Sequence, residues 1–152
     1  MTPSRIRLKV VTERAAWVSV MLEGVRALPS ATVEEFLADP RTAAAAESYL
    51  RRALEALLDL GRHLLAKGFG RAIVEYKEIS AALVEEGILT RSEGDLLRRL
   101  AGYRNRMVHF YHEVSKQEFH ALCTGHLGEL EAILGAFTTW IENHPERRDD
   151  SL

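Results

Sequence analysis

Apolar residues recur along this chain at intervals of three and four positions, which is the period of an amphipathic α-helix. This spacing predicts three long helices, over residues 40 to about 66, 91 to about 108 and 116–144. It also predicts two shorter helices, over residues 11–25 and 76–86, and a single helical turn at 33–38. No segment shows a convincing alternation of apolar and polar residues, so no strand is predicted.

Local signals mark the ends of these helices. A Ser or Thr followed three residues later by Glu is a capping box, and an Asp before a Pro is typical of a helix N-terminus. Such signals occur at Thr32 with Glu35, Asp39 with Pro40, Thr90 with Glu93, and Ser115 with Glu118. Gly68 and Gly70 are expected to end the longest helix, because glycine readily adopts the left-handed conformation found at helix C-termini.

The expected fold class is therefore all-α, an antiparallel bundle of four to five helices. The chain has 152 residues, of which 47% are hydrophobic and 28% charged, as in an ordinary globular domain with one core. We expect one helical domain over residues 1–145, followed by a charged, flexible tail at 146–152.

The overall charge gives no general affinity for nucleic acid, since 20 Lys and Arg against 22 Asp and Glu leave a net charge of −2. Any such affinity has to come from a local patch. The single cysteine, Cys123, cannot form an internal disulfide, and no apolar run is long enough to cross a bilayer. These observations favour a cytoplasmic protein that has no membrane contact.

The segment with the most chemistry lies at 101–114, between the last two predicted helices. Residues 91–112 carry five arginines and only two acids, an excess that either marks a binding site or belongs to a solvated face balanced by acids elsewhere. Within it, four residues separate Arg104 from His109, and Tyr111 follows two positions later. The next capping signal begins at Ser115, so His109 must lie near a helix C-terminus, where the helix dipole favours a protonated imidazole.

Arginine and histidine suit the cleavage of RNA without a metal. His109 titrates near neutral pH and can move protons at the 2′-hydroxyl and the leaving oxygen. Arg104 stays charged and offers a planar fork to phosphate oxygens, so it can stabilise the charge that develops on the phosphorane. DNA lacks the attacking hydroxyl, so we expect a site of this kind to act on RNA and not on DNA.

The Arg104-x4-His109-x-Tyr111 arrangement resembles the signature of the HEPN superfamily, in particular the HepT-like ribonuclease toxins of HEPN/nucleotidyltransferase toxin–antitoxin pairs. The similarity covers roughly residues 5–141. Segments 33–39, 53–65, 76–89 and 102–105 resemble the family's segments in the same order, and 53–65 includes its Asp-x-Gly element at Asp59-Leu60-Gly61.

This resemblance implies a metal-independent endoribonuclease toxin of a type II toxin–antitoxin pair, working as a homodimer whose two motifs face a shared cleft. Arg104 and His109 would be the catalytic pair, with Asn105 and Tyr111 as supporting residues. The implied partner is a nucleotidyltransferase-fold antitoxin of the MntA type, which in some pairs silences the toxin by transferring AMP to the motif tyrosine, here Tyr111. RNA, with tRNA as one candidate, is the implied substrate, and no cofactor is implied.

Helix geometry constrains how the catalytic pair can meet. Five residues along an ideal helix rotate by about 500°, which leaves Arg104 and His109 about 140° apart. Either the helix loosens before His109, or Arg104 reaches around, or each site takes residues from two chains. The last two alternatives favour a dimer.

Structural roles and other functions stay open at this stage. Arg104 could pair with an acid such as Glu55 or Asp59. His109 could be an ordinary helix-end histidine, and Tyr111 a packing aromatic. The chain could also be a non-catalytic nucleotide- or partner-binding subunit of a two-component nucleotidyltransferase, or a helical adaptor that dimerises through apolar surface. A metal site is not expected, because the ligand types at 109, 112 and 113 have no complementary Cys/His pair.

Overall fold

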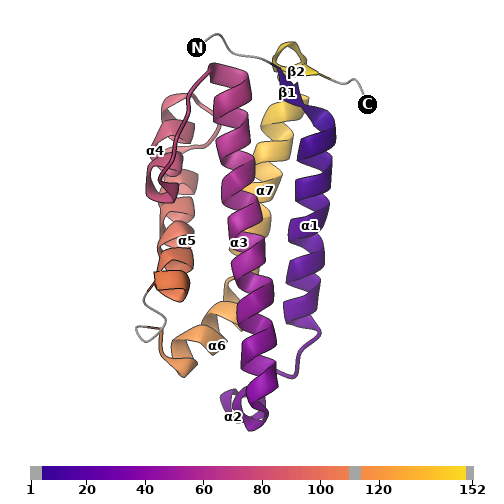
Figure 1. Ribbon diagram of the computed structural model, residues 1–152, viewed down its shortest axis with the longest axis vertical. Helices are drawn as coiled ribbons and strands as arrows, with labels where there is room; N and C mark the ends of the chain where they lie inside the picture. The colour runs from indigo at the N-terminus through magenta and orange to yellow at the C-terminus, as the bar shows by residue number, and fades with distance from the viewer. Residues whose placement is uncertain (1–4, 110–113, 150–152) are drawn as a thin grey trace.

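Seven α-helices lie in the part of the chain that the computed structural model describes, residues 5–109 and 114–149. They are α1 (Leu8–Arg26), α2 (Val33–Ala38), α3 (Pro40–Phe69), α4 (Tyr76–Glu85), α5 (Arg91–His109), α6 (Lys116–Gly125) and α7 (Leu127–Glu142). The helices α1, α3, α5 and α7 run in alternating directions along the long axis, so the predicted all-α antiparallel bundle is confirmed (Figure 1). No helix within these residues combines the length and the apolar character needed to cross a membrane.

The capping signals in the sequence begin real helices. Three side chains accept a hydrogen bond from a backbone N–H of the first turn: Thr32 from Glu35 at 3.0 Å, Asp39 from Arg41 at 2.9 Å and Ser115 from Glu118 at 3.0 Å. The box at Thr90 and Glu93 is reciprocal, because each side chain accepts from the other's backbone N–H. At the other end of α3, Gly70 adopts the left-handed conformation with φ of 66°.

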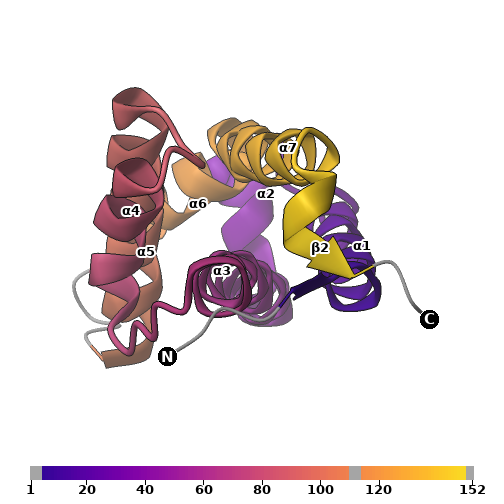
Figure 2. The ribbon, with the colours of Figure 1, turned by 90° about the horizontal axis from the view of Figure 1, so that it is seen from above.

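The central helix is α3, which packs against α1, α4, α5 and α7 (Figure 2). Its buried residues include Leu50, Leu54, Leu57 and Leu64, spaced by three, four and seven positions along one face. Gly61 lies on the same face, where a Cβ would come within 3.1 Å of Leu83 Cδ1, 3.2 Å of Ile79 Cγ2 and 3.3 Å of Phe137 Cζ. The glycine of the Asp-x-Gly element therefore lets α4 and α7 approach α3 closely.

The single helix predicted over 116–144 is wrong, because the structure divides it into α6 and α7 at His126. His126 leaves the helical conformation with φ of −121° and ψ of 2°, directly after Gly125. Its ring Nδ1 lies 2.8 Å from Oε1 of Glu129 in the first turn of α7. The break lets α6 turn away to pack on α2, while α7 runs back along α3 (Figure 1).

A short parallel pair of strands, β1 (Ile6–Arg7) and β2 (Arg148–Asp149), joins the two ends of the described chain. No strand was expected, since two residues are too few to show a periodic pattern. The 3₁₀ helix η2 (Pro145–Arg147) leads into β2, and Nη1 of Arg147 donates to the carbonyl oxygen of Gly68 at 2.6 Å. The described part of the segment expected to be a tail, 146–149, thus has defined contacts with α3 and β1.

Candidate active site

Arg104 occupies a position in the apolar stripe of α5. This stripe consists of Leu97, Leu100, Ala101 and Met107, all of them buried. Arg104 follows Leu100 by four positions and precedes Met107 by three, so its side chain leaves α5 on the same face. Only 19% of the Arg104 side chain is exposed. A charged group at such a position has to be paired with polar partners, because burial of an unpaired charge is costly.

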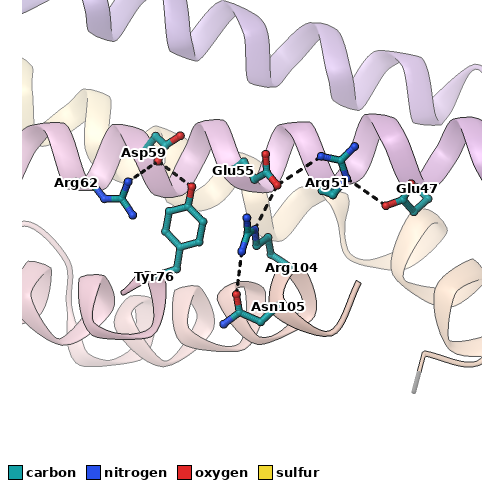
Figure 3. Close-up of polar contacts among 8 residues, drawn as sticks. All are labelled: Glu47, Arg51, Glu55, Asp59, Arg62, Tyr76, Arg104 and Asn105. Carbon is teal, nitrogen blue, oxygen red and sulfur yellow. Dashed lines mark hydrogen bonds and ion pairs between the residues drawn. The ribbon is translucent and has the colours of Figure 1, made fainter. Parts of the chain in front are cut away.

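Two polar partners hold Arg104 (Figure 3). Its Nε donates to Oε1 of Glu55 on α3 at 3.3 Å, and its Nη1 donates to Oδ1 of Asn105 at 3.2 Å. The pairing with Glu55 is the structural contact that the sequence allowed for. Among the described residues, Nη2 of Arg104 donates to no protein acceptor, so one edge of the guanidinium stays free to bind an anion.

Tyr76, the first residue of α4, lies between Arg104 and a second arginine, Arg62 of α3 (Figure 3). The Cζ atoms of Arg62 and Arg104 are each 4.7 Å from the centroid of the Tyr76 ring. Both contacts have the geometry of a cation–π interaction, which orients the planar guanidinium groups.

The hydroxyl of Tyr76 donates to Oδ1 of Asp59 at 2.9 Å, and Nη1 of Arg62 donates to the same oxygen at 3.2 Å. Burial raises the pKa of Tyr76 above its usual value, and the hydrogen bond to Asp59 raises it further. The phenol therefore stays protonated and keeps its donor role. Glu55 and Asp59, one turn apart on α3, thus fix Arg104 and Tyr76 respectively.

A cleft of about 460 Å³ opens beside this network. It is lined by Arg62, Val74, Glu75, Tyr76, Lys77, Arg104 and Asn105, which come from α3, from the segment before α4, and from α4 and α5. Arg62 also donates from Nη2 to the carbonyl oxygen of Val74 at 2.8 Å, and this hydrogen bond joins α3 to the segment before α4 in the wall of the cleft. The cleft brings three cationic side chains to one opening.

The other predicted site residues differ in how far the structure describes them. Asn105 accepts a hydrogen bond from Arg104 through its Oδ1. His109 is the last residue of α5, which confirms its position at a helix C-terminus. The helix runs without a break from Arg91 to His109, which excludes the alternative in which it loosens before His109 and leaves the other two. Tyr111 lies outside the described residues.

The sequence did not reveal the part played by Tyr76 and Arg62. Tyr76 is 17 residues from Asp59 and 28 from Arg104, and no helical spacing links them. The sequence pointed to this site only through Glu55 and Asp59, two acids one turn apart on the longest helix that were possible partners for Arg104. Within the described ranges, no group of three or more His, Cys, Asp or Glu side chains is placed to hold a metal ion.

Comparison with known proteins identifies relatives of the chain. The family described as "Ribonuclease HepT-like" matches residues 21–137, which include Arg104, His109 and Tyr111. YutE from Bacillus subtilis (strain 168), which is named as a candidate RNase, is 29% identical over 94 residues, or 62% of this chain and 58% of that protein. The match thus spans less than two thirds of the relative's length.

Solved structures show the same helical bundle. A tri-AMPylated HEPN toxin from Shewanella oneidensis, in complex with an MNT antitoxin, superposes with a TM-score of 0.77 at 18% identity, covering 86% of this chain and 97% of that one. YutE, described as a cytosolic protein, superposes with a TM-score of 0.72 at 21% identity, covering 88% of this chain and 90% of that one.

Proposed function

The chain belongs to the HepT-like ribonuclease family, and from this premise we propose that it is a metal-independent endoribonuclease toxin of a type II toxin–antitoxin pair. The observation that carries the proposal is the Arg104-x4-His109-x-Tyr111 motif, which lies within the matched residues and begins with an arginine fixed by Glu55 and Asn105. We also propose that the protein is cytosolic, because the related protein YutE is described as a cytosolic protein.

In this proposal Arg104 is the fixed cation and His109 the proton carrier. The free edge of Arg104 binds the non-bridging oxygens of the scissile phosphate and stabilises the charge of the phosphorane. The neutral imidazole of His109 takes the proton of the 2′-hydroxyl, the 2′-oxygen attacks the adjacent phosphorus, and the bond to the 5′-oxygen breaks. His109, at the helix C-terminus, protonates the leaving oxygen. The products are a 2′,3′-cyclic phosphate and a 5′-hydroxyl, so neither water nor a metal is consumed in this step.

The active form is a homodimer with composite sites. Because α5 is unbroken through His109, the directions of Arg104 and His109 from the helix axis differ by about 140°. One phosphate is therefore reached by Arg104 of one subunit and by His109 of the partner subunit. This arrangement supports a cleft between two copies rather than a site within one chain.

The test is cleavage of tRNA and of bulk RNA by purified protein in EDTA, beside the variants His109→Ala and Arg104→Ala. We expect the unaltered protein to cut and each variant to lose roughly a hundredfold or more in rate. Equal cleavage by all three proteins, or none by any of them, would overturn the catalytic assignment. Mixing the two variants tests the composite site, since a heterodimer of them regains one intact Arg104–His109 pair.

The proposed partner is a nucleotidyltransferase antitoxin that silences the toxin by transferring AMP to Tyr111. A related toxin structure is both AMPylated and bound to an MNT antitoxin, which supports this assignment. Mass spectrometry of the chain co-expressed with such a partner should show a gain of one or more AMP units. The gain should persist in the control variant Tyr103→Phe and disappear in Tyr111→Phe; its persistence in Tyr111→Phe would contradict the assignment.

A further inference from the structure

The cleft beside Tyr76 collects cations from three separate helices. Arg62 comes from α3, Lys77 from α4 and Arg104 from α5, and among the described lining residues the one acid is Glu75. On a single helix, neighbouring side chains are three or four positions apart in the sequence. The spacing within one helix therefore cannot bring these three cations together. The tertiary fold itself therefore creates this concentration of positive charge.

The two guanidinium groups, of Arg62 and Arg104, are held in a fixed arrangement. Tyr76 lies between the two guanidinium groups, and its hydroxyl is anchored on Asp59 at 2.9 Å (Figure 3). Both Cζ atoms lie 4.7 Å from the ring centroid, so their separation is at most twice that distance. Tyr76 therefore keeps the two guanidinium groups close together, where they can face neighbouring phosphates of one strand.

The residues around the ring favour recognition of charge over recognition of a base. The two arginines already stack on Tyr76, so the ring is not free to stack a nucleobase. Glu55 and Asp59 pair with Arg104 and Arg62, and in the part of the chain that the structure describes the exposed Lys77 has no recorded ion pair. The ammonium of Lys77 is thus available to an incoming anion at the mouth of the cleft.

We propose that this cleft is a second phosphate site for RNA, in which Lys77 binds the phosphate next to the one that Arg104 engages for cleavage, and the positive charge of Arg62 supports that contact. The inference rests on the proposed ribonuclease function, because that function assigns Arg104 to the scissile phosphate. The contact is with the backbone and carries no sequence information of its own. It fixes the register of the strand, so that the scissile phosphate meets Arg104.

The test separates binding from cleavage by using the His109→Ala variant of the chain. The dissociation constant of a single-stranded RNA oligonucleotide is measured over a range of salt concentrations, with Lys77→Gln and, as a matched control, Lys9→Gln on α1 added to that background. Loss of one phosphate contact should lower the slope of log affinity against log salt by about 0.7. We expect Lys77→Gln to show this change with an affinity about threefold weaker, and Lys9→Gln to leave both quantities unchanged.

A second measurement replaces single phosphates of the oligonucleotide with uncharged methylphosphonate linkages. Besides the scissile linkage that Arg104 engages, one adjacent linkage should weaken binding to the His109→Ala chain, and the effect of that adjacent linkage should largely disappear once Lys77→Gln is present. Equal salt slopes for the two lysine variants, or an equal loss at every linkage in both backgrounds, would overturn the second site.

Failure of the proposed function would look different. If the unaltered chain cuts no RNA while Lys77→Gln still lowers the salt slope, the ribonuclease assignment fails and the phosphate site stands. If the chain cuts RNA and Lys77→Gln behaves as Lys9→Gln does, the phosphate site fails alone. Absence of RNA binding by the His109→Ala chain overturns the phosphate site outright. Both lysines are exposed, so loss of folding does not confuse these outcomes, and thermal unfolding of each variant checks this.

Discussion

Oε1 of Glu55 accepts a hydrogen bond from Nε of Arg104 at 3.3 Å, across the interface between α3 and α5. Both side chains are largely buried there, with 27% of Glu55 and 19% of Arg104 exposed. Glu55 accepts from Nε and Asn105 from Nη1, which leaves Nη2 for an anion. Glu55 therefore acts on the proposed reaction through Arg104, by fixing the direction of its free edge.

Replacing Glu55 by Gln should lower the turnover number for RNA about two- to fivefold, because the pair contributes up to about 1 kcal/mol to the placement of Arg104. Cleavage rates and the midpoint of chemical unfolding are measured together. Glu131→Gln is the matched control, since Glu131 pairs with Arg26 of α1 and contacts neither Arg104 nor Glu55 among the described residues. Equal turnover for the two variants would show that the Glu55 pair is structural only.

Tyr76 supports two interactions that two substitutions can separate. Tyr76→Phe removes the hydrogen bond to Asp59 and keeps the ring under both arginines, so we expect stability to fall by about 1 kcal/mol with nearly unchanged turnover. Tyr76→Leu also removes the ring and should reduce turnover several-fold. The comparison uses the turnover number, KM and the free energy of unfolding of each protein. A turnover in Tyr76→Leu that equals that of Tyr76→Phe would contradict the orienting role of the ring.

The sequence predicted those parts of the structure that depend on local signals. Four helix starts followed from side chains that cap their own first turn, and the position of His109 followed from the start of the next helix at Ser115. The division at His126 was missed because the apolar spacing continues across it, and only packing of α6 on α2 redirects the chain. The strand pair at Ile6 and Arg148 depends on contacts between the two ends of the chain, which no local pattern records.

The same division holds for the candidate site: residues in a local motif could be predicted, and residues brought together by packing could not. The sequence singled out Arg104, Asn105 and His109 as candidates because their motif is continuous along the chain, and the structure places Arg104 and Asn105 in contact. Arg62 and Tyr76 were missed because only the packing of α3, α4 and α5 brings them to Arg104. The acids Glu55 and Asp59 were recognised as possible partners, but which cation each would take depended on the relative positions of the helices.

Gly61 allows the close approach of three helices around the site, and its replacement by Ala should destabilise the protein. The new methyl group would lie 3.1–3.3 Å from Leu83, Ile79 and Phe137, which are fully buried and cannot move aside easily. We expect a loss of about 1–2 kcal/mol in the free energy of unfolding. Gly135→Ala in α7 is the control, because no atom lies within 4 Å of its Cβ position; it should stabilise by about 0.5–1 kcal/mol. Stabilisation by both substitutions would mean that the core around Gly61 has room to spare.

His63 should make the stability of the bundle depend on pH. Burial, together with the smaller effect of the positive charges of Arg14, Lys67 and Arg7, lowers the pKa of His63 to about 4. Its Nε2 accepts a hydrogen bond from the backbone N–H of Arg7 at 3.3 Å, which requires a neutral ring and links β1 to α3. The unfolded chain binds a proton near pH 6.5 and the folded chain only near pH 4, so the contribution of His63 is complete above pH 6.5 and is lost as the pH falls toward 4.

The loss should be on the order of 1–2 kcal/mol, after a discount for solvent screening of a half-buried ring. Denaturant unfolding at a series of pH values measures it, with His63→Gln as the comparison, because glutamine offers an acceptor and does not titrate. The variant should show a smaller decline between pH 6.5 and 4 than the unaltered protein. Parallel curves for the two proteins would mean that other groups cause the acid sensitivity, and that the link between β1 and α3 does not depend on the charge of His63.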